Sequence, residues 1–142
     1  MYNPKVMEIF KNPKNVGSLK GANGIGKVGN AACGDVMKIY LKINDNGIIE
    51  DAKFKTFGCA AAITSTSVAT EMIKGRTIEE ALQLKNSEII EYLGGLPAQK
   101  IHCSILAEEA IRAAVEDYYK KKEKEAKKNN VEVEEYDEED DF

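Results

Sequence analysis

The sequence predicts a single α+β domain, in which a small antiparallel sheet is followed by packed helices. Residues 36–43 alternate apolar and polar side chains, residues 48–57 do so again, and NDNG between them is typical of a hairpin turn. After residue 59 the apolar spacing changes to that of helices. A chain of 142 residues can bury one core, so we expect one domain.

The N-terminal part should form a helix and then a loop. Asn3 is a typical helix cap with Pro4 at the first helical position, and the helix should stop before Pro13. Residues 12–30 are rich in glycine and asparagine and indicate a loop that merges into a short strand near residues 25–32.

The two alternating segments should each present one face to the core. The side chains expected to face inward are Met37, Ile39, Leu41, Ile43, Ala52 and Phe54. Those expected to face solvent are Lys38, Tyr40, Lys42, Asp51, Lys53 and Lys55.

Helices are expected in the second half of the chain. A helix after Cys59 should close at Gly75, and residues 77–80 form a capping box for a short helix. Asn86 and Ser87 should cap another helix that ends at the Gly94–Gly95 pair. A long helix is expected over about residues 102–122, which completes a domain of residues 1–122.

Charge is segregated along the chain. Residues 132–142 carry eight acids and no base, so residues 123–142 are expected to be a charged, disordered tail. Residues 1–119 contain 14 basic and 14 acidic residues, which leaves no basic footprint for nucleic acid. No apolar run reaches the roughly 20 residues of a membrane helix, and residues 1–10 do not resemble a signal peptide. We expect a cytoplasmic protein without nucleic-acid or membrane partners.

Residues 24–29, GIGKVG, match the dinucleotide-binding pattern G-x-G-x-x-G. That pattern binds a pyrophosphate only where a strand leads into it and a helix begins after it. Here a loop precedes it and strand character follows. We therefore expect the glycines to serve loop flexibility and close backbone approach near Cys33.

Three cysteines lie at element boundaries. Cys33 precedes a strand in Cys-Gly-Asp, Cys59 follows a strand in Phe-Gly-Cys, and Cys103 follows His102 at the start of the long helix. Thiolates with an imidazole suit both zinc and iron–sulfur clusters, but the spacing is not that of a zinc finger. Burial of all three as small apolar side chains is the plain alternative.

A cysteine-dependent enzyme is a weaker interpretation. The catalytic base must hydrogen-bond the thiol, whereas neighbouring residues on a helix diverge by about 100°. His102 is the only histidine and adjoins Cys103, so the pair would fit this role only if the helix began after it. We expect no enzymatic activity.

The chain resembles the IscU/NifU-type iron–sulfur cluster assembly scaffolds over about residues 2–119. The resemblance is carried by NPKNVGS at 12–18, ACGDVM at 32–37, NDNGIIEDAKFKTFGC at 44–59 and KIHCSILAEEAI at 100–111. It implies a three-stranded antiparallel sheet with helices packed on it. It also implies assembly of a labile [2Fe–2S] cluster from desulfurase-derived persulfide and Fe²⁺, and its transfer to apoproteins.

The resemblance also implies a ligand set and partners. Cys33, Cys59 and Cys103 would be thiolate ligands, with Cys103 the primary sulfur acceptor, and Asp35 and His102 would compete for the remaining position. Asp35 would keep the cluster exchangeable, and Zn²⁺ could occupy the same site. The partners would be a cysteine desulfurase, recipient apoproteins or carriers, and a ferredoxin as electron donor.

Two features depart from the family pattern. Bacterial scaffolds that work with an Hsp70-type chaperone carry LPPVK where residues 96–100 read LPAQK, so dependence on that chaperone does not follow. The acidic residues 132–142 are not part of the pattern either. The alternative to a cluster scaffold is a zinc-stabilised binding module with no iron–sulfur role.

Overall fold

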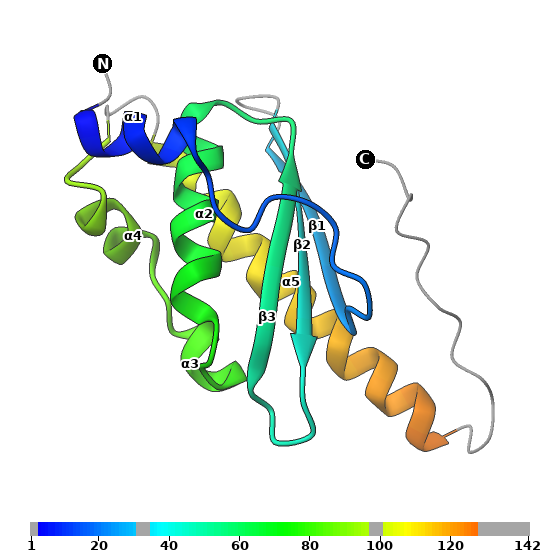
Figure 1. The fold of residues 1–142 in the computed structure, drawn as a ribbon. Coiled ribbons are helices and arrows are strands. Elements are labelled where there is room, and N and C mark those ends of the chain that lie inside the picture. Colours follow the sequence, from blue (N-terminus) through cyan, green and yellow to red (C-terminus); the bar gives the residue numbers. More distant parts are fainter. Residues whose placement is uncertain (1–2, 31–34, 97–100, 128–142) are drawn as a thin grey trace.

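The computed structural model describes residues 3–30, 35–96 and 101–127, with only the backbone described at 30, 35, 102–104 and 125–127. Within these residues a helix precedes three strands, and four helices follow them (Figure 1). The helices and strands are α1 (Pro4–Lys11), β1 (Gly24–Asn30), β2 (Asp35–Ile43), β3 (Ile49–Thr56), α2 (Ala60–Ile73), α3 (Ile78–Leu82), α4 (Asn86–Tyr92) and α5 (Ile101–Lys127). The predicted α+β class is confirmed, whereas residues 128–142 lie outside the described part.

The three strands form an antiparallel sheet in the order β1-β2-β3. The hairpin between β2 and β3 is the one predicted from NDNG. The Asn44 side chain accepts hydrogen bonds from the backbone N–H groups of Asn46 (2.9 Å) and Ile48 (3.0 Å). Gly47 has φ +77°, a conformation that glycine adopts without strain.

One face of the sheet carries the core. The inward residues predicted for β2 and β3 are all buried, and α2 and α5 pack on that face. α5 lies against β1 and β2, and α2 fills the space between β3 and α5 (Figure 1). Within the described residues, no helix is long and apolar enough to span a membrane.

β1 and α5 pack closely against each other. A Cβ atom added to Gly26 would lie 2.4 Å from the backbone N of Ala114 and 2.5 Å from the carbonyl O of Ala110. At Gly24 the nearest atom would be the carbonyl O of Ala114, at 2.7 Å. The loop-flexibility interpretation of these glycines was therefore wrong. They lie in a strand, and their missing side chains let the helix backbone reach the sheet.

The other face of the sheet is covered in part by the segment between α1 and β1. The backbone of this segment pairs with the edge of β3, where the Gly17 N–H donates to the carbonyl of Phe54 (2.8 Å). The segment then crosses in front of the strands to reach β1 (Figure 1). Two residues of this face that were predicted to be exposed are buried, since Tyr40 is only 1% exposed and Lys38 only 5%. They lie on the predicted face of β2, but the expectation that their side chains face solvent was wrong.

Asn15 fastens this segment to α2. Its side-chain amide donates to Thr70 Oγ1 and to Glu71 Oε1, each at 3.0 Å, and the Lys74 ammonium donates to its carbonyl oxygen. The Asn15 hydrogen bond, aided by Lys74, lowers the pKa of Glu71 below its ordinary value of 4.5.

Most predicted helix ends are confirmed. The Asn3 side chain accepts from the Val6 N–H at 2.9 Å, and Thr77 forms the capping box at α3. The predicted Asn86–Ser87 cap is shifted by one residue, since Lys85 occupies the cap position and its N–H donates to Glu88 Oε2 (2.9 Å). α5 continues to Lys127, five residues beyond the predicted helix end.

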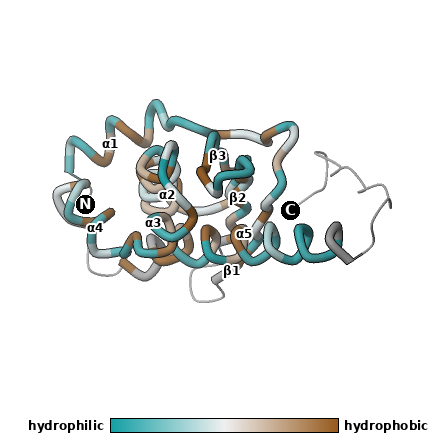
Figure 2. Tube along the Cα trace, turned by 90° about the horizontal axis from the view of Figure 1, so that it is seen from below, coloured by the Kyte–Doolittle hydropathy of each residue, from teal (hydrophilic) through white to brown (hydrophobic). Residues whose placement is uncertain are grey.

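The far end of α5 extends beyond the sheet and is hydrophilic (Figure 2). In this part of α5, Lys121 Nζ lies 2.7 Å from Asp117 Oδ2. Its partial burial lowers the pKa of its ammonium group, although the hydrogen bond with Asp117 opposes that shift.

Candidate functional site

Two of the three cysteine segments meet at one end of the sheet. β1 ends at Asn30 and β2 begins at Asp35, and these two residues are register partners. Residues 31–34, which include Cys33, join them and lie outside the described residues. β3 leaves the sheet at this same end, since the Phe57 N–H donates to the carbonyl of Val36 at 3.2 Å. The segment leading to Cys59 therefore begins beside the start of β2.

The first turn of α5 lies level with this end of the sheet. Gly26 packs between Ala110 and Ala114. From Gly26 to Asn30 the strand advances by four residues, or about 13 Å. Moving back by eight residues from Ala110 along α5 covers about 12 Å and leads to residue 102. The start of α5 therefore lies toward the end of the sheet at which β1 ends, although the helix crosses the strands at an angle (Figure 1).

Cys59 is the one candidate ligand whose side chain the structure describes. It occupies the cap position of α2 with an extended backbone (φ −77°, ψ 175°), and its side chain is half-buried against the core. Its carbonyl accepts the Ile63 N–H at 3.0 Å, which closes the first helical turn. The free N–H groups at a helix N-terminus favour an anion at this position.

The remaining candidate ligands are placed only by their backbone. Asp35 is the first residue of β2, and His102 and Cys103 follow Ile101 in the first turn of α5. The helix thus begins before the His-Cys pair, which removes the one condition under which the pair could act as base and nucleophile. The ligand set of Cys33, Asp35, Cys59, His102 and Cys103 remains a prediction.

Exposed apolar side chains flank the cysteine segments, a feature that the sequence reasoning missed. Phe57 is 70% exposed, and Ile101 and Ile105 are each more than one third exposed. For Phe57 the sequence did offer a signal, since it continues the outward-facing series Asp51, Lys53 and Lys55. Such exposed apolar groups are typical of protein contact surfaces.

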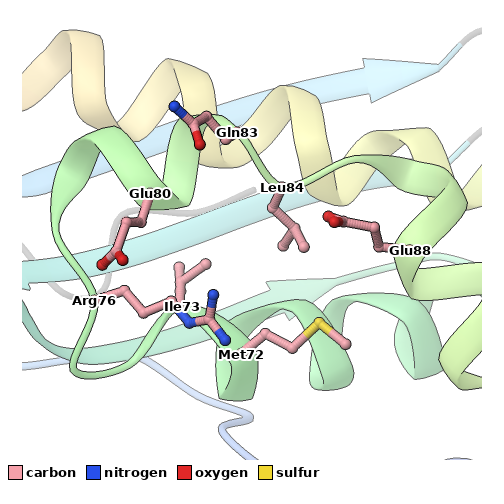
Figure 3. A pocket seen from close by; sticks show the side chains of 7 residues that line it. All are labelled: Met72, Ile73, Arg76, Glu80, Gln83, Leu84 and Glu88. Carbon is pink, nitrogen blue, oxygen red and sulfur yellow. The ribbon is translucent and has the colours of Figure 1, made fainter.

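The described cavities lie elsewhere. One cavity of about 350 Å³ lies between the end of α2 and α3 and α4 (Figure 3). Its lining residues are Met72, Ile73, Arg76, Glu80, Gln83, Leu84 and Glu88. It lies at the far end of the 14-residue α2, about 20 Å from Cys59. This cavity has charged walls and no thiol, so it is not part of the cysteine site.

A second, larger hollow of about 750 Å³ lies beside α1 and α2. Its walls include Ile9, Val68, Met72 and Tyr92. The Lys5 ammonium lies over the Tyr92 ring, 3.9 Å from its centre. Cation–π contact and apolar packing account for these residues. The other walls of the hollow are polar and include Glu8, Lys14, Ser67 and Glu71, and its described lining contains no cysteine or histidine.

A small α+β domain, in which helices pack on a three-stranded antiparallel sheet, defines the class of protein. The family model of the NifU-like N-terminal domain matches residues 1–125. The chain therefore belongs to the NifU-like N-terminal domain family.

Relatives of known name support this assignment. The chain is 58% identical over 121 residues to iron-sulfur cluster assembly scaffold protein IscU 1 of Archaeoglobus fulgidus, covering 85% of this chain and 78% of that protein. It is 57% identical over 124 residues to the IscU scaffold protein of Azotobacter vinelandii, covering 85% and 96%. It is 54% identical over 125 residues to that of Escherichia coli K12, covering 86% and 97%.

Solved structures have the same fold. A SUF-system iron-sulfur cluster assembly scaffold from Fervidobacterium islandicum superposes with a TM-score of 0.68 at 26% identity, covering 80% of this chain and 96% of that one. A NifU-like N-terminal protein from Brucella abortus gives 0.68 at 20% identity, covering 84% and 94%. The second likeness shows the fold alone.

Proposed function

We propose that this chain is a scaffold on which an iron–sulfur cluster is assembled and from which it is passed to apoproteins. The single observation that supports this best is that the strand ends on either side of Cys33, the segment leading to Cys59 and the start of α5 lie toward the same end of the sheet. Family membership and the IscU relatives support the same role.

The cluster is the cargo of this protein, with [2Fe–2S] as the form we propose. Cys33, Cys59 and Cys103 supply soft thiolates, and Asp35 or His102 completes the set. A carboxylate is a hard ligand that binds iron–sulfur clusters weakly, so Asp35 would favour release. Sulfur would come as persulfide from a cysteine desulfurase and iron as Fe²⁺, with electrons from a ferredoxin-type donor. The protein itself binds and orients these groups.

The test is anaerobic assembly with a cysteine desulfurase, cysteine, a reductant and ferrous iron. We expect visible charge-transfer bands that move to an added apo-ferredoxin. Cys59→Ser should lose these bands while keeping its circular dichroism spectrum. Formation of a colourless zinc protein under these conditions would overturn the proposal in favour of the zinc-stabilised module.

The exchange role of Asp35 has its own test. Asp35→Ala should hold the cluster longer in a transfer assay, because a hard ligand is removed. Asp45→Ala is the matched control, since it makes the same charge change in the exposed hairpin at the opposite end of β2. A shorter-lived cluster in Asp35→Ala, with Asp45→Ala unchanged, would contradict the role.

A further inference from the structure

The cavity between the end of α2 and the helices α3 and α4 combines an apolar surface with charges of both signs (Figure 3). Its apolar lining consists of Met72, Ile73 and Leu84. Its polar lining is exposed and consists of Arg76, Glu80, Gln83 and Glu88. We call this space of about 350 Å³ the Arg76 cavity.

The two carboxylates of the Arg76 cavity are held by the backbone at the start of their own helices. Glu80 Oε1 accepts the Thr77 N–H at 3.0 Å, as part of the capping box of α3. Glu88 Oε2 accepts the Lys85 N–H at 2.9 Å at the start of α4. Each hydrogen bond uses one carboxylate oxygen, and the second oxygen has no partner among the described residues. Both carboxylates therefore keep an acceptor that a ligand can use.

Arg76 brings the opposite charge to the cavity. Its backbone is fixed, because its carbonyl accepts the Ile49 N–H at 2.8 Å. Its guanidinium group forms no ion pair or hydrogen bond within the described part of the chain. Figure 3 shows this group extending toward Met72, while the Glu88 carboxylate is directed toward Leu84 from the other side. A cation and an anion thus lie on either side of an apolar surface without compensating each other.

Charge selects among the ligands that this lining can hold. A lone anion would meet Arg76 but also two carboxylates, and a lone cation would leave the guanidinium group uncompensated. An uncharged apolar molecule would shield the charged groups from water without giving them a partner. A molecule with a carboxylate, an ammonium group and an apolar group matches every part of the lining.

We propose that the Arg76 cavity binds a free α-amino acid with an apolar side chain. The planar guanidinium group of Arg76 would pair with the ligand carboxylate. The ligand ammonium would donate to the second oxygen of Glu80 or Glu88, and its side chain would cover Met72 and Leu84. A volume of about 350 Å³ lies at the lower end of the range for small-molecule sites. Because the charged groups are exposed, each ion pair adds little, and we expect a Kd on the order of 1 mM.

A bound amino acid would contact α2, α3 and α4 together. It would therefore stabilise the packing of the two short helices on the end of α2. The cysteine end lies at the other end of α2, about 20 Å away, and stays uncovered. None of the lining residues is a candidate cluster ligand, so amino-acid binding and cluster assembly can each fail without the other.

Titration of the ¹⁵N-labelled full chain with L-leucine, followed through the backbone amide shifts, tests the proposal. The shifts should saturate and should be centred on residues 72–88. Three analogues each lack one part of the ligand: leucinamide the carboxylate, N-acetyl-L-leucine the ammonium group, and glycine the side chain. Each should bind at least about tenfold more weakly. Equal affinity for L-leucine and any analogue, shifts centred elsewhere, or no saturable shift would overturn the proposal.

The chain offers a matched control for the role of Arg76. Arg76→Gln should weaken L-leucine binding about tenfold, whereas Arg112→Gln makes the same change at an exposed position of α5 and should leave it unchanged. Glu88→Gln keeps an acceptor for the Lys85 N–H and should also weaken binding. Unchanged binding by Arg76→Gln, or an equal loss in Arg112→Gln, would refute the site. The amide spectra of the unliganded variants verify their fold, and the analogue series on the wild type decides the matter if a variant misfolds.

Discussion

Replacing Gly26 by alanine should displace α5 from the sheet. The added Cβ would lie 2.4 Å and 2.5 Å from two backbone atoms of α5, while real Cβ contacts are essentially never shorter than 3.0 Å. The helix must therefore move by about 0.6 Å at least, and neither obstructing atom can rotate away. Overpacking of this kind costs about 1–3 kcal/mol. Urea or thermal unfolding of the purified variant would measure the loss of stability.

The control is a glycine with open space. Gly21 has φ +81° and nothing within 4 Å of an added Cβ, so Gly21→Ala suffers only the left-handed backbone penalty of about 1–2 kcal/mol. Ala114→Gly should not rescue Gly26→Ala, because the obstructing atoms belong to the backbone. A Gly26→Ala variant of wild-type stability, or full rescue by Ala114→Gly, would refute this account of the packing.

A structural displacement should also change the reactivity of the cysteine end. α5 carries Cys103 in its first turn, so a shift at Gly26 moves Cys103 relative to β1. We expect the rate of Cys103 alkylation to differ between Gly26→Ala and wild type, and to be the same in Gly21→Ala and wild type. Equal rates in all three proteins would show that α5 yields locally and leaves its first turn in place.

Two other substitutions probe how the N-terminal segments are fastened. Asn3→Ala should lower the free energy of unfolding in urea by about 1–2 kcal/mol, because Asn3 caps α1 and also donates to the carbonyls of Leu93 (2.9 Å) and Gly95 (3.3 Å). Asn3→Asp should keep the cap and lose the donated hydrogen bonds. Its stability should therefore lie between those of the wild type and Asn3→Ala. Glu71→Gln should lose at most about 0.5 kcal/mol at pH 7, since the carboxylate is about half exposed. The lowered pKa of Glu71 means that its contribution is present above its ordinary value of 4.5 and is lost as the pH falls through the folded-state pKa. Unfolding at pH 7 and pH 3 should therefore show a difference that disappears at the lower pH, and a difference that grows on acidification would contradict the assignment.

The order of elements and most of their ends follow from the sequence, because they depend on local signals. Periods of two and 3.6 residues, the cap at Asn3, the NDNG turn and the capping box at Thr77 all act within a few residues. The errors come from contacts between distant segments. Tyr40 and Lys38 alternate as solvent-facing residues should, yet both are buried on the face that the chain between α1 and β1 crosses. No local pattern near residue 40 predicts the burial of these two side chains.

The same distinction explains how far the candidate site could be predicted. In an antiparallel meander the residue before the second strand and the residue after the third lie at the same end, so Cys33 and Cys59 could be placed together from the strand pattern alone. Cys103 could not, because three helices intervene and their directions depend on packing. The glycines of β1 help to determine its place, since their missing side chains let the backbone of α5 approach the sheet closely. Glycine, which has no reactive side chain, thus helps to place Cys103, the cysteine that we propose as sulfur acceptor. The pattern GIGKVG is therefore informative, although in our interpretation it binds no nucleotide.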